Sequence, residues 1–122
     1  MNPKISIRPT VTTEPTENAS EGFQNATLRP ILKLQHDIFL EIFRNYLVKR
    51  KKAFDKMAVE DRAIYIEQTL KTDQKFKQFL LGTVVGLFTV EELQVYFENE
   101  NELNRRTITM LIERLKSVLA AE

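Results

Sequence analysis

The stretch that decides the fold is residues 28–54, which read LRPILKLQHDIFLEIFRNYLVKRKKAF. After Pro30 this stretch contains no glycine or proline. A proline is tolerated in the first turn of a helix, because its missing N–H has no intrahelical partner there. Thr27 stands just before, and a threonine hydroxyl can cap a helix by accepting a bond from a backbone N–H. We therefore predict one long central helix over residues 28–54, against which the other helices pack.

Apolar side chains cover most of this predicted helix. Successive helical residues advance by about 100°, which places these side chains on one broad side. They are Ile31, Leu32, Leu34, Ile38, Phe39, Ile42, Phe43, Tyr46 and Leu47. Only a narrow polar stripe remains, so we expect the helix to be covered nearly all the way round, by its own domain or by a partner.

Three polar residues, Gln35, His36 and Asn45, interrupt the apolar side. Burying such groups is unfavourable unless they are hydrogen-bonded. Either they bond to neighbouring segments and fix the register of the helix, or they line a pocket or an interface. We treat the three as a candidate buried polar cluster.

A basic patch lies toward the end of the central stretch. Its members are Arg44, Lys49, Arg50, Lys51, Lys52 and Lys56. Cations near the C-terminus of a helix interact favourably with the helix dipole, which explains the run without any ligand. The same side chains could instead contact phosphates. The patch is therefore a candidate surface for a protein partner, for nucleic acid or for the ribosome.

The composition favours a single helical domain. The chain has 122 residues, of which 43% are hydrophobic, and it contains only three glycines and four prolines. Few glycines and prolines are typical of helices rather than of a turn-rich β fold. The longest apolar run, residues 79–90, is shorter than the roughly 20 residues that span a bilayer. Since there is also no cysteine and no apolar signal stretch at the start, we expect a cytoplasmic protein without disulfides.

The residues needed for common catalytic chemistry are missing. With one histidine and no cysteine, a conventional zinc site is not expected. A Ser–His–Asp triad would need His36, yet no serine lies in a nucleophile elbow. No glycine-rich loop that could cradle a phosphate is present. The sequence therefore predicts no catalytic residue, no cofactor and no metal site.

The remaining chain divides into an arm and further helices. Residues 1–26 are rich in Thr, Pro, Glu, Asn and Ser, a composition that does not fold alone, so we expect a flexible or partner-bound arm before a helical domain over residues 27–122. Hydrophobic periodicity and capping residues predict four helices after the central one. They are residues 57–71, 74–88, 90–98 and 102–120. The predicted fold is thus an all-α, five-helix bundle.

Two local features of the later helices call for an explanation. Gly82 and Gly86 lie four apart inside a predicted helix, where each glycine costs about 0.5–1 kcal/mol relative to alanine. Close approach of another backbone would explain them, and a ligand resting on the bare surface is the alternative. Residues 89–92 read Thr-Val-Glu-Glu, which is a capping box. Capping explains Glu91 and Glu92 without a catalytic role.

Two segments resemble a known family. They are FQNATLRPILKLQHDIF at residues 23–39 and LGTVVGLFTVEELQVYFENENELNRR at residues 81–106. Both are similar to small, mainly helical bacterial proteins without a settled function, some of which carry the label glyoxalase. That label would imply a metal-dependent βαβββ fold with His and Glu ligands. The chain has one histidine and no strand-like alternation, so the resemblance implies a single helical domain and no mechanism.

These observations lead to a ranked set of functional hypotheses. The first is a non-enzymatic interaction or adaptor module, a homo-oligomer or a subunit of a larger assembly. The second is association with nucleic acid or the ribosome through the basic patch. The third is a small-ligand binder or enzyme with a pocket near Gln35, His36 and the face of Gly82 and Gly86.

Overall fold

The computed structural model describes residues 2–121, and these residues form helices and loops without any β-strand. The prediction of an all-α fold is confirmed. The α-helices in chain order are α1 (Pro3–Ser6), α2 (Ala19–Phe23), α3 (Arg29–Leu34), α4 (His36–Lys49), α5 (Val59–Thr72), α6 (Gln74–Val85), α7 (Val90–Glu98) and α8 (Glu100–Leu119). This set exceeds the five predicted helices, because part of the arm is helical and the central stretch is divided.

The central stretch begins earlier than predicted. A π-helical segment, Gln24–Leu28, joins α2 to α3, so helical backbone runs through Pro30 instead of starting beside it. Proline clashes with the carbonyl four residues before it, and the wider π turn accommodates that clash. Thr27 is therefore not a helix cap. Its hydroxyl instead donates to the Glu92 carboxylate, with an oxygen–oxygen distance of 3.1 Å.

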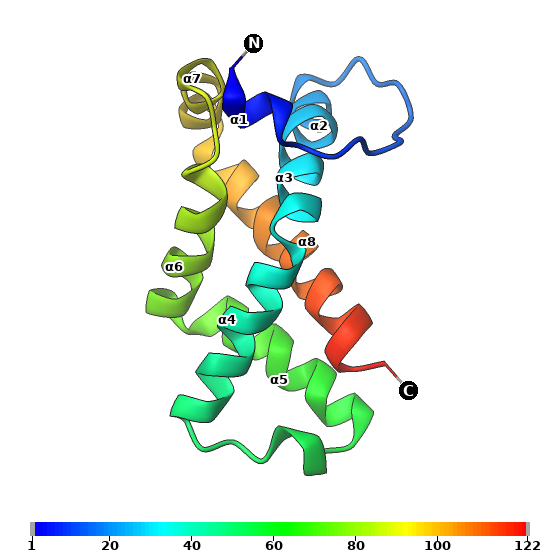
Figure 1. Ribbon diagram of the computed structural model, residues 1–122, viewed down its shortest axis with the longest axis vertical. Helices are drawn as coiled ribbons and strands as arrows, with labels where there is room; N and C mark the ends of the chain where they lie inside the picture. The colour runs from blue at the N-terminus through cyan, green and yellow to red at the C-terminus, as the bar shows by residue number, and fades with distance from the viewer. Residues whose placement is uncertain (1, 122) are drawn as a thin grey trace.

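One residue, Gln35, divides the central stretch into α3 and α4. Its backbone has φ −93° and ψ 8°, outside the helical range, although Phe39 N–H still bonds to its carbonyl. Figure 1 shows α3 and α4 following one another down the middle of the molecule. The single helix predicted for residues 28–54 is thus two helices, and the second ends at Lys49.

The end of α4 is a Schellman motif. The N–H of Lys52 bonds to the Leu47 carbonyl, and the N–H of Lys51 bonds to the Val48 carbonyl. Lys51 has φ 54°, the left-handed conformation that usually carries glycine at this position. Phe54 then lies in a short 3₁₀ helix, Phe54–Lys56, and its side chain is buried.

The hydrophobic core lies where α4, α5, α6 and α8 meet. Helix α5 packs against α8 and α6, and α8 also packs against α4, α6 and α7. Figure 1 shows α8 crossing diagonally behind the α3–α4 pair, with α6 on the opposite flank and α5 below. The least exposed large side chains are Phe39, Phe43, Leu28, Ile31, Leu32, Ile66, Leu70, Leu80, Leu103, Leu111, Leu115 and Val84.

The sequence predicted that the central stretch is covered nearly all the way round, and this prediction is wrong. Phe39 and Phe43 are fully buried, but Ile38 is 48% exposed and Val48 is 74% exposed. Phe76 of α6 packs against Phe43 and Tyr46, so α6 covers part of α4 as well. Two parts of α4 stay open: Ile38 lines a hollow with α6, and Val48 lines another at the connection from α4 to α5.

The other helices match their predicted positions closely. Helix α7 has the predicted bounds, and its capping box between Thr89 and Glu92 is confirmed. Helix α6 ends at Val85, three residues before the predicted end, and α8 begins two residues early at Glu100. Within residues 2–121, no helix has the length and hydropathy needed to cross a membrane.

The N-terminal arm lies against the folded domain. The Lys4 ammonium donates to the carbonyls of Gly86 and Phe88, at 3.3 and 3.1 Å. Phe23 packs edge-on against Phe88, with ring centroids 5.6 Å apart. The predicted boundary at residue 26 falls inside continuous helical backbone, so in this structure the chain itself holds the arm.

Candidate functional site

A groove between α4 and α6 has a mainly apolar lining. It encloses about 400 Å³. Its lining residues are Ile38, Glu41, Ile42, Asn45, Tyr46 and Lys49 from α4, and Phe76 and Phe79 from α6. Phe79 is 57% exposed and Ile38 is 48% exposed, although both residue types are usually buried. Exposed apolar side chains that gather in one groove make this surface a candidate interaction site.

The spacing of the open residues on α4 is that of a helix–helix seam. Ile38, Ile42, Asn45 and Lys49 follow one another at intervals of four, three and four residues. Residues spaced in this way form the contact stripe when two helices pack side by side. The exposed side of α4 thus has the residue spacing of a helix that packs against a second helix.

A polar clamp fixes one end of the groove. The Tyr46 hydroxyl donates to Asp73, with 2.7 Å between the oxygens, and the Arg50 guanidinium donates to the same carboxylate oxygen at 2.8 Å. Burial, followed by the hydrogen bond to Asp73, raises the pKa of Tyr46 to about 12. The hydrogen bond from Tyr46 and that from the Phe76 N–H lower the pKa of Asp73. Because Asp73 also caps α6, the clamp ties the end of α4 to the start of α6.

The sequence predicted that another backbone approaches Gly82 and Gly86 closely, and no other segment of the described chain does so. Both are exposed. A Cβ built on Gly82 would meet nothing within 4 Å, and one built on Gly86 would lie 3.1 Å from the Gly82 carbonyl oxygen. Gly82 lies one turn after Phe79 on the same side of α6. The chain's own packing therefore gives no reason for a glycine at position 82.

The three residues of the predicted polar cluster do not form one buried cluster. Gln35 and His36 are half-buried, and Asn45 is exposed. The Gln35 amide donates to the Thr83 carbonyl at 3.5 Å, so it faces α6. His36 faces α8, where its Nδ1 lies 3.2 Å from an Arg114 nitrogen. Asn45 alone lines the α4–α6 groove, and the third hypothesis, a pocket that unites Gln35 and His36 with the two glycines, is not supported.

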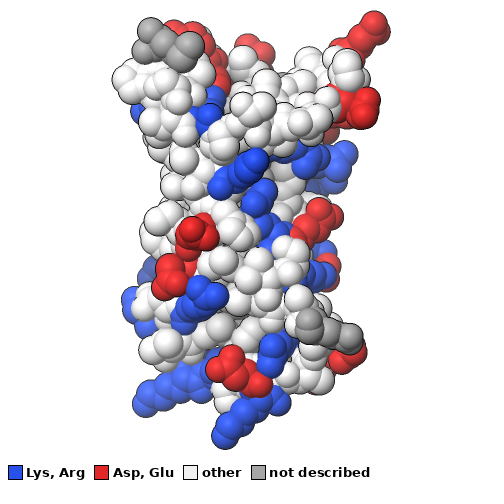
Figure 2. All heavy atoms as spheres, turned by 45° about the vertical axis from the view of Figure 1, so that its right-hand side comes forward, with Lys and Arg blue, Asp and Glu red and all other residues white. Residues whose placement is uncertain are grey.

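The basic patch gathers around the connection from α4 to α5. All six predicted members are exposed, and Figure 2 shows Lys and Arg side chains projecting at this end of the molecule. Two of them form ion pairs, Arg44 with Glu41 and Arg50 with Asp73. A third, Lys52, places its ammonium over the Tyr65 ring, 4.9 Å from the centroid. A hollow of about 430 Å³ lies in the patch. It is lined by Arg44, Leu47, Val48, Lys51, Lys52, Ala53, Phe54, Asp55, Lys56 and Leu119.

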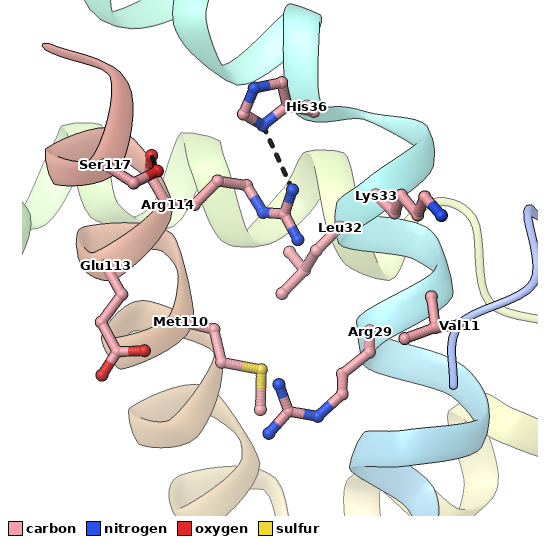
Figure 3. Close-up of a pocket in the computed structure, with 9 residues that line it drawn as sticks. All are labelled: Val11, Arg29, Leu32, Lys33, His36, Met110, Glu113, Arg114 and Ser117. Atoms are coloured by element: carbon pink, nitrogen blue, oxygen red, sulfur yellow. Dashed lines mark hydrogen bonds between the residues drawn. The ribbon is translucent and has the colours of Figure 1, made fainter. Parts of the chain in front are cut away.

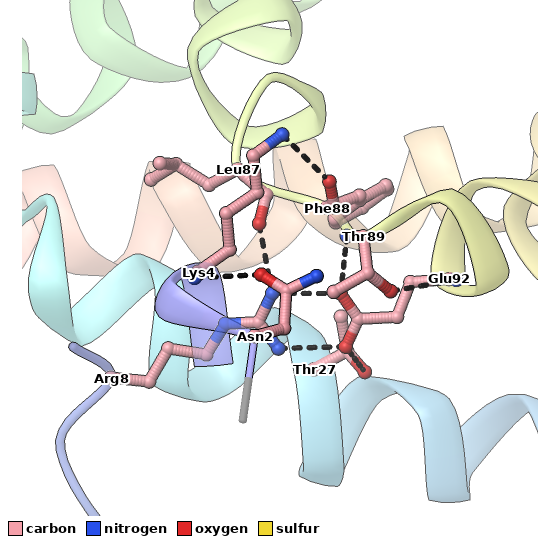
Figure 4. A network of polar contacts seen from close by, with 8 residues as sticks. All are labelled: Asn2, Lys4, Arg8, Thr27, Leu87, Phe88, Thr89 and Glu92. Carbon is pink, nitrogen blue, oxygen red and sulfur yellow. Dashed lines mark hydrogen bonds and ion pairs between the residues drawn. The ribbon is translucent and has the colours of Figure 1, made fainter. Parts of the chain in front are cut away.

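A second polar node anchors the arm on the capping box (Figure 4). Both terminal nitrogens of Arg8 donate to the Glu92 carboxylate at 2.7 Å, and one of them also donates to the Leu87 carbonyl at 2.8 Å. The Arg8 side chain is only 6% exposed. Burial alone would raise the pKa of Glu92, but the bonds from Arg8, from the Thr89 N–H and from Thr27 outweigh it and lower that pKa. Glu92 thus has a structural role that combines helix capping with arm docking.

Sequence reasoning missed Phe79 and Ile38 as surface residues. The signal for Phe79 lay in the wheel of α6, where Phe79 falls on the side of Gly82 and Gly86 and about 100° from Leu80. The signal for Ile38 lay in the four-three-four spacing that it shares with Asn45 and Lys49. Ile38 was expected to be covered, because apolar character alone does not tell which neighbour covers a helix.

Neither a metal centre nor a known relative accounts for the groove. Among residues 2–121, no group of three or more His, Cys, Asp or Glu side chains could hold a metal ion. No family model, no curated protein and no solved structure matches the chain. The resemblance to small helical bacterial proteins therefore stays a prediction.

Proposed function

We propose that the protein is a non-enzymatic interaction module that assembles through the α4–α6 groove, with a second copy of the chain as its occupant. The observation that carries this proposal is the open apolar groove lined by Ile38 and Ile42 of α4 and Phe79 of α6. Gly82 lies one turn after Phe79 on α6, with nothing within 4 Å of a Cβ added there. A helix-interior glycine without a packing reason costs about 0.5–1 kcal/mol in the isolated chain. Glycine would be favourable at this position if a second helix packed closely there, because a side chain would keep the two backbones apart.

Charge supports a second copy as the occupant. Glu41 and Lys49 both line the groove, each four residues from Asn45 along α4. In a two-fold symmetric dimer the same surface meets itself with reversed direction. A two-fold axis near Asn45 brings Glu41 of each copy opposite Lys49 of the other. It also brings the two Asn45 side chains together, and a polar pair in an apolar seam fixes the register of helix pairing.

The proposal includes a cytoplasmic location and the absence of catalytic activity. A chain without cysteine is typical of proteins that need no disulfide. The predicted resemblance to helical bacterial proteins agrees with this setting. An assembly role needs only the surface described above and no reactive side chain.

Light scattering after gel filtration tests the proposal. The wild type is expected at twice the 14.3 kDa mass of the chain. Phe79→Ser and Ile38→Ser are each expected to give the monomer mass, because they place a polar group in the apolar seam. Ile64→Ser is the matched control, since Ile64 is equally exposed on α5, outside the groove. A monomeric wild type at high concentration, or a dimer that both groove variants retain, would contradict the proposal.

A second candidate function, nucleic-acid binding by the basic patch, is favoured by Lys51. This lysine occupies the left-handed position of the α4 cap, where glycine would be less strained. Backbone strain that the fold does not require points to a function for the side chain. Lys51 and Lys52 both line the hollow of the patch, next to the exposed Val48.

The second candidate is tested by binding of a single-stranded RNA over a salt series. Lys51→Glu combined with Lys52→Glu is expected to weaken binding and to reduce the salt slope by about two, one for each lost phosphate contact. Lys75→Glu combined with Arg105→Glu reverses the same number of charges at exposed positions elsewhere and is the control. Equal affinity of both double variants would reject this function.

A further inference from the structure

A third surface, separate from the groove and from the basic patch, is a cationic hollow between α3 and α8. It encloses about 360 Å³ and opens to solvent. Arg29 and Lys33 line it from α3, His36 from the start of α4, and Arg114 from α8. Figure 3 shows Arg114 extending from α8 toward His36 and Arg29 extending from α3 toward Met110, with Leu32 between the two guanidinium groups. Figure 2 shows Lys and Arg side chains crossing the middle of a face of the molecule.

The cations in this hollow lack acidic partners. The contacts of Arg29 and Lys33 are to neutral oxygens: Arg29 Nε donates to the Asn25 side chain at 3.1 Å, and Lys33 donates to the Thr10 carbonyl at 3.2 Å. Arg114 contacts His36 Nδ1, which must accept, because a guanidinium has only donors. Within residues 2–121, none of the three cations forms an ion pair, although Glu113 also lines the hollow.

This arrangement is electrostatically unfavourable without a ligand. Arg114 is half-buried, and burial followed by repulsion from Arg29 lowers its pKa. Charged groups removed from water are normally paired. An anion placed between the two guanidinium groups would relieve both the desolvation of Arg114 and its repulsion from Arg29.

We propose that the hollow binds a phosphate group, carried by a small molecule, between Arg29 and Arg114. Guanidinium groups present donors in a fork that matches the oxygens of phosphate, and two of them on opposite walls can hold one tetrahedral group. Lys33 adds a third positive charge at the rim. The volume lies in the range of small-molecule sites, so a phosphorylated metabolite fits and a folded macromolecule does not enter.

Isothermal titration calorimetry of the full chain with inorganic phosphate, against sodium chloride of equal ionic strength, tests the site. The wild type is expected to bind phosphate and not chloride. Arg114→Gln and Arg29→Gln are each expected to weaken phosphate binding by roughly tenfold or more, the loss of one charge-assisted hydrogen bond. Arg105→Gln removes an exposed arginine from the same helix α8 and is expected to bind as the wild type does.

Two further measurements separate the alternatives. Without phosphate, the melting temperature of Arg114→Gln is expected to equal or exceed that of the wild type, because a half-buried charge without an acidic partner is removed. Vesicles that contain phosphatidic acid test a lipid headgroup as the source of the phosphate, and binding lost in Arg114→Gln would support the same site. No binding of phosphate or vesicles by the wild type, or binding that both arginine variants retain, would overturn the inference.

Discussion

Gly82 is the residue at which stability and assembly are in conflict. Nothing lies within 4 Å of a Cβ added there, so alanine gains helix propensity without a clash. We expect Gly82→Ala to raise the free energy of unfolding of the monomer by about 0.5–1 kcal/mol. We also expect it to weaken the dimer, because the added methyl group lies where the second helix approaches.

Chemical denaturation in the Phe79→Ser background measures the first effect without interference from assembly. Gly86→Ala is the matched control, because its Cβ would lie 3.1 Å from the Gly82 carbonyl oxygen and should give a smaller gain. A loss of stability in Gly82→Ala would mean that the glycine serves the fold of the single chain. The proposed role in assembly would then lose its main support.

Glu92 is the residue that couples the arm to the domain, and it makes stability depend on pH. The pKa of Glu92 in the folded protein lies below its ordinary value of 4.5. Its contribution to stability is therefore complete above pH 4.5 and is lost as the pH falls through the folded-state pKa. We expect Glu92→Gln to cost about 2–4 kcal/mol at neutral pH, because Arg8 then stays buried without its partner.

Denaturation midpoints between neutral and acid pH check this expectation. The loss of stability on acidification should be smaller in Glu92→Gln than in the wild type, since one titrating group is gone. Glu91→Gln removes the exposed neighbour in the same helical turn and should leave both the neutral stability and the acid slope near those of the wild type. Identical behaviour of the two variants would argue against the arm-docking role of Glu92.

At the scale of elements, the end of α4 combines a strained backbone with the basic patch. Lys51 adopts φ 54°, which carries a penalty of roughly 1 kcal/mol for a residue with a Cβ. We expect Lys51→Gly to stabilise the protein by about 0.5–1 kcal/mol, as measured by thermal or chemical unfolding. Lys51→Ala removes the charge and keeps the strain, so it should not stabilise. Equal effects of the two variants would assign the gain to lost charge repulsion.

The elements were predictable where their signals are local. The capping box of α7 and the Asp73 cap of α6 were both readable, because capping depends on residues within one turn. The break at Gln35 was not, since residues on both sides favour a helix and the interruption depends on tertiary packing. The π turn before Pro30 was missed for a related reason: a proline signals a helix start, but a wider turn also satisfies its geometry.

At the scale of the whole molecule, the sequence predicted the fold class and only part of the candidate site. Periodicity identifies which residues of a helix are apolar, but it does not identify the neighbour that covers them. Asn45 was expected to be buried and lies on the groove, whereas Ile38 was expected on the covered side of the central helix and is 48% exposed. The arm was expected to be flexible or partner-bound because of its polar composition. Its docking could not be predicted, because Arg8 and Glu92 lie far apart in the chain and their pairing leaves no local signal.

The central claim is that two copies meet along α4 with the two-fold axis near Asn45, and a chain without cysteine allows a direct measurement of it. A single Asn45→Cys substitution places one thiol of each copy beside the other. Under mild oxidation in dilute protein we expect a covalent dimer to form rapidly on non-reducing gels. Ile64→Cys, equally accessible on α5, should stay largely monomeric. Equal and slow crosslinking of the two variants would contradict the proposed assembly.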